Sequence, residues 1–183
     1  MIISKESREC FIAIPKSGTT TILSAIQPLG FEVTGKNATW KPHKWPQAGR
    51  HDPCAPRGYY RFVVVRNPIR RLQSQYNDFV KSPQKWEHEG KYDNCSLEEF
   101  CEMSLSREAN ERPWFHLNQA QFISNIHIDL VLRLEDIAEA KGFQLQDRWV
   151  PVTTHENSHE YEDQKVPDSM RDWIEEDAKA FGY

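Results

Sequence analysis

Short, continuously apolar segments alternate along the chain with longer segments in which apolar residues recur every three or four positions. Phe11–Ile14 is an apolar run that ends at Pro15, and Arg61–Val65 is rich in β-branched residues. Runs that are apolar on both faces are typical of strands buried in a parallel sheet. The pattern therefore predicts strands over these two segments and a third strand over Asp129–Leu134.

Helical periodicity accompanies the predicted strands. A helix is predicted from about Thr20, and Asn67 is placed to cap a second helix that begins at Pro68. The buried stripe of this second helix is predicted to consist of Ile69, Leu72, Tyr76 and Phe79. Further helices are predicted at the capping box Ser96–Glu99, around Leu117–Ser124, before Gly142 and over Ser169–Ala180.

This alternation predicts an α/β fold with a central parallel sheet flanked by helices. The 183 residues suffice for one hydrophobic core, so a single domain over residues 1–183 is expected. A net charge of −4 argues against a general nucleic-acid binder, and no apolar run reaches the roughly 20 residues of a membrane span. The first residues lack the pattern of a secretory signal, so a cytoplasmic location is expected.

The cysteines do not form a metal-binding pattern. Cys10, Cys54, Cys95 and Cys101 include no CxxC pair and match no zinc spacing. Cys10 leads into a predicted strand and Cys101 lies on the apolar side of a predicted helix. We therefore expect reduced thiols that act partly as small hydrophobic residues, and no metal site.

The loop after the first predicted strand has the composition of a phosphate-binding loop. Gly18 permits a tight turn, and the amides that open the next helix favour an anion. Lys16 adds a positive charge but precedes the only glycine, so this is not a Walker A loop. A turn rich in Ser and Thr merely because they cap helices would look similar. The candidate binding residues are Pro15, Lys16, Ser17, Gly18, Thr19, Thr20 and Thr21.

A second candidate anion site follows the second predicted strand. Arg66 stands at the strand's carboxyl end, where open α/β sheets bind ligands. Ser74, on the next helix, is predicted to share an outward face with Arg70 and Arg71. An arginine and a hydroxyl so placed can hold a phosphate by charge-assisted hydrogen bonds. The alternative is a solvent-exposed basic start of a helix.

Together the two segments resemble the sulfotransferases that use 3′-phosphoadenosine-5′-phosphosulfate (PAPS), in the branch of carbohydrate, heparan and many bacterial enzymes. Pro15–Thr20 is similar to the family's 5′-phosphosulfate loop, and Arg66–Tyr76 is similar to its 3′-phosphate signature, with the spacing from arginine to serine intact. Gln119–Ile123 followed by Asp129–Asp136 resembles a third family region, and Glu156–Ser158 followed by Asp177–Tyr183 resembles the family's ending. The resemblance implies a P-loop-like sulfotransferase fold, with Lys16 near the 5′-phosphate and Arg66 and Ser74 on the 3′-phosphate.

The resemblance also implies a reaction, the transfer of a sulfuryl group to an acceptor hydroxyl with release of the desulfated nucleotide PAP. Lys16 would stabilise charge on the leaving phosphate. His43, in the long loop between the two motifs, is the first candidate for the base, because bacterial relatives often place a histidine there. His51 is the second, because the adjacent Asp52 could orient its ring, and Glu135 is a carboxylate alternative.

The branch that the chain resembles implies an acceptor hydroxyl on a carbohydrate or another alcohol. Four tryptophans in or near loops could stack on a sugar or cover small cores, and these are Trp40, Trp45, Trp86 and Trp114. Trp149 and Trp173 are interpreted as packing residues. Two other functions stay open: a non-catalytic module that binds PAP or PAPS, and a P-loop-type small-molecule kinase, which the missing Walker lysine disfavours.

Overall fold

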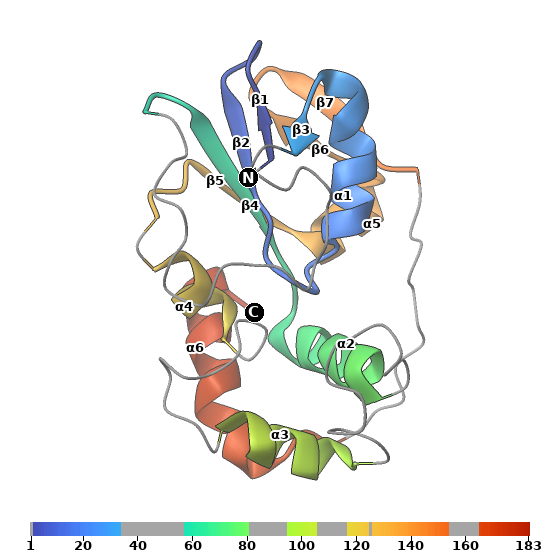
Figure 1. Ribbon diagram of the computed structural model, residues 1–183, viewed down its shortest axis with the longest axis vertical. Helices are drawn as coiled ribbons and strands as arrows, with labels where there is room; N and C mark the ends of the chain where they lie inside the picture. The colour runs from blue at the N-terminus through green and yellow to red at the C-terminus, as the bar shows by residue number, and fades with distance from the viewer. Residues whose placement is uncertain (1, 34–56, 81–94, 106–116, 125, 154–164) are drawn as a thin grey trace. The chain divides into compact units, whose positions relative to one another are not determined.

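A computed structural model describes residues 2–33, 57–80, 95–105, 117–124, 126–153 and 165–183 (Figure 1). The chain divides into two compact units. Unit 1 comprises Met1–Trp40, Asp52–Arg66 and Asn125–His159. Unit 2 comprises Lys41–His51, Asn67–Ser124 and Glu160–Tyr183.

Unit 1 is built on a mixed sheet with the strand order β3-β1-β2-β4-β5. Its strands are β1 (Ile2–Ser4), β2 (Glu9–Ile12), β3 (Glu32–Val33), β4 (Tyr60–Val65) and β5 (Leu130–Arg133). The three predicted strands are confirmed as β2, β4 and β5, which pair in parallel. The predicted parallel sheet is thus confirmed at its centre, and β1 adds antiparallel pairing with both β2 and β3 at one side. Both added strands are too short to produce a recognisable periodicity.

The core of unit 1 surrounds β4, whose residues Phe62–Val65 are all buried. The Phe62 ring stacks on Phe11 with centroids 5.1 Å apart and meets Phe31 edge-on at 5.9 Å. Helices α1 (Thr19–Ile26) and α5 (Leu134–Ala140) contribute the buried side chains Ile22, Ile26 and Ile137, and a short 3-10 helix, η1 (Gln27–Leu29), follows α1. Burial on both faces of β4 confirms the interpretation of its apolar run.

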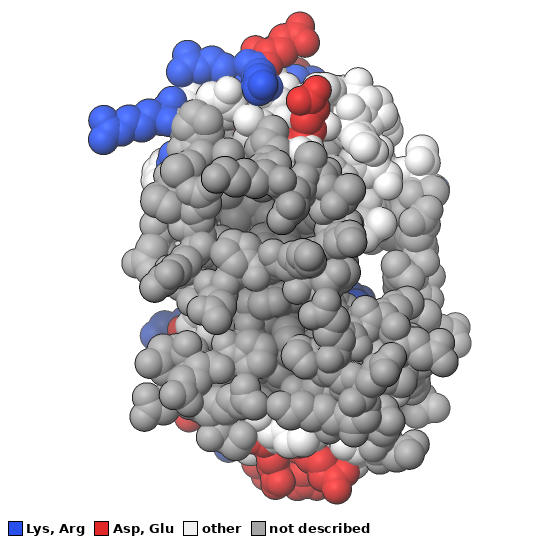
Figure 2. Space-filling view, in the orientation of Figure 1, with Lys and Arg blue, Asp and Glu red and all other residues white. Residues whose placement is uncertain are grey.

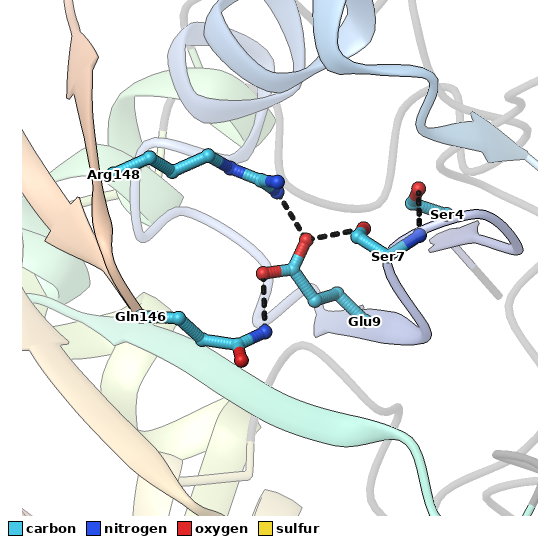
Figure 3. A network of polar contacts seen from close by, with 5 residues as sticks. All are labelled: Ser4, Ser7, Glu9, Gln146 and Arg148. Carbon is cyan, nitrogen blue, oxygen red and sulfur yellow. Dashed lines mark hydrogen bonds and ion pairs between the residues drawn. The ribbon is translucent and has the colours of Figure 1, made fainter.

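An antiparallel hairpin of β6 (Gly142–Leu145) and β7 (Arg148–Pro151) also belongs to unit 1. A buried carboxylate, Glu9 at the start of β2, ties the hairpin to the sheet (Figure 3). Glu9 accepts hydrogen bonds from Ser7 Oγ at 2.6 Å and Gln146 Nε2 at 2.7 Å, and it pairs with Arg148. Because the charge is paired and hydrogen-bonded on both oxygens, its burial is compatible with a stable fold.

Trp149 on β7 is 53% exposed, so its interpretation as a packing residue was wrong. Side chains alternate across a strand, and the next residue, Val150, is the one that faces the core. The Trp149 ring instead covers Gly142, where a Cβ would lie 2.6 Å from the ring. Gly142 is the first residue of β6. The helix that was predicted to end there, α5, ends at Ala140 with its C-cap at Lys141.

Unit 2 is helical in its described part. Its elements are α2 (Pro68–Val80), α3 (Leu97–Leu105), α4 (Gln119–Ile123), η5 (Asp168–Met170) and α6 (Arg171–Phe181). They enclose a cluster of buried residues, namely Leu72, Leu97, Phe100, Cys101, Met170 and Trp173. The predicted packing role of Trp173 is thus confirmed.

Both predicted helix caps of unit 2 are confirmed. Asn67 Oδ1 accepts hydrogen bonds from the amides of Ile69 at 3.1 Å and Arg70 at 3.2 Å. In the capping box, the Ser96 amide donates to Glu99 Oε2 at 2.7 Å, and the Glu99 amide donates to Ser96 Oγ at 3.2 Å. These local bonds depend on residues a few positions apart, which is why the sequence predicted them.

The predicted buried face of α2 was only partly correct: Tyr76 packs against the unit 2 cluster as expected, but Ile69 does not lie inward. Ile69 is 38% exposed, whereas Arg71 is fully buried and Gln75 nearly so. Leu72 is buried as expected, and the side chain of Phe79 lies outside the described residues. A polar network, and not an apolar stripe alone, occupies the inner face of this helix. Hydrophobic periodicity does not register such a network.

Two of the cysteines behave as small hydrophobic residues. Cys10 and Cys101 are buried and not in disulfides, and Cys95 is a partly exposed free thiol. Burial raises the pKa of Cys10 to about 11 and that of Cys101 to about 12. Both thiols are therefore protonated and unreactive at neutral pH. Cys54 lies outside the described residues.

Candidate functional site

The loop between β2 and α1 has a backbone suited to an anion. Lys16 has a φ of 66° and Gly18 a φ of 74°, both in the left-handed region. When left-handed and right-handed residues alternate in a short loop, their N–H groups form a concave array that binds phosphates. Gly18 is also the N-cap of α1 and has no side chain to occupy the first amides of that helix. The loop therefore combines two backbone features that attract negative charge.

Gly18 is required for steric reasons as well as for its backbone conformation. A Cβ at this position would lie 2.5 Å from Leu134 Cδ1 and 2.9 Å from Cδ2. Leu134 is the first residue of α5, directly after β5. The carboxyl end of β5 and the loop after β2 thus pack against each other without room for a side chain.

The hydroxyls of the loop have different environments. Thr19 is buried, and its Oγ1 donates to the Ile14 carbonyl at 2.8 Å, so it fixes the shape of the loop. The Ser17 amide bonds to the same carbonyl at 3.4 Å. Thr20 is exposed and Thr21 half-buried, which leaves their hydroxyls accessible to a ligand. Of the remaining predicted residues, Pro15 is buried and Lys16 is half-buried.

Arg66 lies beside this loop. It follows β4, and β2 and β4 run in parallel, so their carboxyl ends share one edge of the sheet (Figure 1). Arg66 Nη1 donates to the Lys16 carbonyl at 3.3 Å. The structure therefore brings together two of the predicted site residues whose motifs lie far apart in the sequence.

A third basic residue, Arg133, ends β5 at the same edge. It pairs in register with Val65, the residue before Arg66, and it is half-buried. The sequence analysis assigned no role to Arg133. Arg133 could have been predicted as a site residue from its position at the end of the third predicted strand. The carboxyl ends of parallel strands meet at one edge of the sheet.

In unit 2, Ser74 is half-buried on α2 and Arg70 is exposed. Arg71, predicted to share their outward face, is instead fully buried. Its Nη1 donates to the Leu117 carbonyl at 3.0 Å, and its guanidinium lies 5.5 Å from the centre of the Trp173 ring. Burial lowers the pKa of Arg71 to about 10, against the opposing effect of the Asp177 carboxylate.

Asp177 on α6 completes this buried network. It accepts hydrogen bonds from the Gln119 amide at 2.9 Å, from Gln119 Nε2 at 3.1 Å and from the Ala120 amide at 2.8 Å. Burial raises the pKa of this carboxyl, and the Arg71 guanidinium and the three donors lower it in part. Tyr76 has a structural contact too, because its hydroxyl donates to the Cys95 carbonyl at 2.9 Å.

Among the described residues, two groups of exposed charges are found, one in each unit. In unit 1, exposed basic residues gather at the end of the sheet opposite the loop, where Lys5, Arg8 and Arg57 precede their strands (Figure 2). In unit 2, acidic residues gather over α3, where Glu98, Glu99 and Glu102 are exposed (Figure 2).

The candidate bases are only partly located. His43 and His51 lie outside the described residues, as do Trp40, Trp45, Trp86 and Trp114. Glu135 is exposed in the first turn of α5, one residue after Leu134. His127 is largely exposed and contacts Asp129 at 3.1 Å, far along β5 from its carboxyl end.

Within the described ranges, no group of His, Cys, Asp and Glu is arranged to hold a metal ion. Among the helices of that same part of the chain, none combines the length and the apolar character needed to cross a membrane.

A comparison with protein families gives one match. The model of a group described as the sulfotransferase family matches residues 1–181, which include both units. No curated protein and no solved structure matches the chain significantly.

Proposed function

Because the chain belongs to the sulfotransferase family, we propose that it transfers the sulfuryl group of PAPS to an acceptor hydroxyl and releases PAP. The observation that supports this most directly is the hydrogen bond from Arg66 to the Lys16 carbonyl. It joins the two anion motifs at one edge of the sheet, as a ligand with two separate phosphate groups requires. We also propose that both units form a single sulfotransferase domain, since the family match spans them.

In this proposal the loop Pro15–Thr21 binds the 5′-phosphosulfate. The left-handed backbone at Lys16 and Gly18 and the first amides of α1 support that role. Arg66 and Ser74 bind the 3′-phosphate, a group that ATP lacks. PAPS is then a co-substrate and no metal ion takes part in its binding.

The reaction would be an in-line displacement at sulfur. The acceptor oxygen forms a bond to sulfur while the bond from sulfur to the bridging phosphate oxygen breaks, and PAP leaves with the electron pair. Lys16 stabilises the charge that develops on the leaving phosphate. The acceptor proton passes to a base, for which His43 is the first candidate, His51 the second and Glu135 the third.

The acceptor is proposed to be a glycan or another alcohol, on the resemblance to the carbohydrate sulfotransferases. Incubation with sulfur-labelled PAPS and a panel of glycans, phenols and lipid alcohols tests both the activity and the acceptor class. Transfer to any member of the panel supports the proposal. Tight binding of PAP without transfer to any acceptor would favour the non-catalytic module.

Nucleotide selectivity tests the 3′-phosphate assignment separately. PAP is expected to bind about 10–150-fold more tightly than AMP, because AMP lacks the charge-assisted contacts to Arg66 and Ser74. Calorimetry with both nucleotides measures the ratio, and Arg66→Ala should reduce it to near one. Equal affinities in the wild-type protein would contradict the assignment.

A further inference from the structure

We propose that Arg66 is also a positioning residue, which holds the loop after β2 in its anion-binding shape and so couples the two phosphate sites. The inference rests on the proposed function of that loop. It starts from the hydrogen bond of Arg66 Nη1 to the Lys16 carbonyl at 3.3 Å. Through this contact Arg66, which is proposed to bind the 3′-phosphate, also bonds to the backbone of Lys16, which is proposed to lie at the 5′-phosphate.

Lys16 is the position in the loop that most needs support. Its φ of 66° lies in the left-handed region, where a side chain with a Cβ is sterically disfavoured. Such a conformation persists only when the surrounding contacts over-determine it. Gly18 has a similar φ, but as a glycine it adopts this conformation without that cost.

Contacts at three points, among others, hold the loop in its shape. Near its start, Thr19 Oγ1 and the Ser17 amide both bond to the Ile14 carbonyl. Near its end, the Leu134 side chain packs against Gly18. Arg66 supplies the third point, on the carbonyl of the strained residue itself. Loss of Arg66 therefore removes one restraint from Lys16 while the contacts of Ile14 and Gly18 remain.

A guanidinium can hold the loop and bind a phosphate at the same time. It carries five N–H donors in a planar fork, and the bond to the Lys16 carbonyl is made by Nη1. A 3′-phosphate that fixes Arg66 would then also fix the loop, and a 5′-phosphate in the loop would fix Arg66. The two halves of the ligand bind cooperatively through one side chain.

The first test uses AMP, which has no 3′-phosphate. If Arg66 supports the loop, Arg66→Ala weakens AMP binding about 3–10-fold by calorimetry, in addition to removing the preference for PAP. Arg57→Ala, which removes an exposed charge at the opposite end of β4, leaves AMP affinity unchanged. If Arg66→Ala lowers PAP affinity alone, the positioning role is overturned while the proposed function stands.

The second test needs no nucleotide. Amide hydrogen exchange over residues 15–22 should become about 3–10-fold faster in Arg66→Ala than in the wild-type protein, because the strained loop opens more often. In a Lys16→Gly background, where the left-handed conformation is unstrained, Arg66→Ala should change the exchange much less. Unchanged exchange in Arg66→Ala overturns the inference, whatever the nucleotide measurements show. Binding of neither PAP nor AMP by the wild-type protein would instead end the proposed function.

Discussion

Arg66 and Arg71 occupy contrasting regions of the molecule although they belong to one short segment. Arg66 is half-buried at the carboxyl edge of the unit 1 sheet, where its side chain meets a loop built for anions. Arg71 is fully buried in unit 2, between the Leu117 carbonyl, the Trp173 ring and the charge of Asp177. One arginine is accessible to a ligand, whereas the charge of the other is used inside the fold.

The difference shows that an arginine in a segment that resembles a phosphate-binding signature can have a structural role instead. A buried guanidinium with a carbonyl acceptor, an aromatic ring and a nearby carboxylate is already solvated by the protein. Moving it to a ligand would leave Asp177 as a buried charge. The loop Pro15–Thr21 together with Arg66, named the anion edge for its proposed role, should therefore respond to mutation in ligand binding and reaction rate. The buried network around Arg71 and Asp177 should respond in stability.

The largest expected effect lies in the buried network. Arg71→Ala should lower the free energy of unfolding by about 3–5 kcal/mol, because it leaves the Asp177 carboxylate buried without its cationic neighbour. Urea denaturation measures this loss. Arg70→Ala, at the adjacent exposed position, should change stability by about 0.5 kcal/mol or less. A folded Arg71→Ala protein that had lost its preference for PAP over AMP would show that Arg71 belongs to the anion site after all.

At the anion edge, Lys16→Ala should slow sulfuryl transfer about 10²–10³-fold, since the lysine is assigned to charge that develops during the reaction. The affinity for PAP should fall much less. Single-turnover kinetics and calorimetry separate the two quantities. Lys5→Ala, an exposed lysine at the other end of the same sheet, serves as the control. Equal losses of rate and affinity would mean that Lys16 is only a ground-state phosphate ligand.

Proton transfer at the anion edge is expected to depend on His43. His43→Ala should leave PAP affinity near that of the wild type and lower the transfer rate about 10²-fold or more. The wild-type rate should rise with pH through a pKa near about 6.5, because the neutral imidazole is the base. An inactive His51→Ala beside an active His43→Ala would move the assignment to His51. If neither histidine matters, Glu135 is the carboxylate to replace next.

The local structure of the anion edge was largely predictable from the sequence, and that of the buried network was not. The phosphate loop, the end of β4 and the caps at Asn67 and Ser96 depend on residues that are neighbours in the chain. Short-range patterns of this kind determine the local structure by themselves, without contacts from distant parts of the chain. The contact of Arg66 with Lys16 follows from one further rule, that carboxyl ends of parallel strands meet at the same edge.

The remaining features depend on residues that are distant in sequence. The inward rotation of Arg71 requires Leu117, Trp173 and Asp177, and nothing near Arg71 in the chain predicts them. Similarly, Glu9 is buried because the β6–β7 hairpin brings Gln146 and Arg148 to it. A periodicity analysis treats each of these charged residues as a surface position, so it places them wrongly.

The smallest expected effect concerns the charge of Asp177. Burial raises its pKa above that of an ordinary aspartate despite Arg71 and the three N–H donors. At pH values above about 3.9, the ordinary value, the folded protein then retains a proton at Asp177 that the unfolded chain has already released. By linkage, this residue's contribution to the free energy of unfolding is present below about pH 3.9 and is lost as the pH rises through the folded pKa.

Asp177→Asn removes this titration. The free energy of unfolding of the wild type minus that of the variant should therefore fall as the pH rises from about 4. Urea denaturation at a series of pH values measures it, with Asp172→Asn on the exposed face of α6 as the matched control. If this value instead rises with pH, the attraction to Arg71 outweighs desolvation and folding favours the charged carboxylate. In that case Arg71 and Asp177 would form a stabilising ion pair. The contrast with Arg66 would then be greater, because the charge of Arg71 would stabilise the fold and would not be available to a ligand.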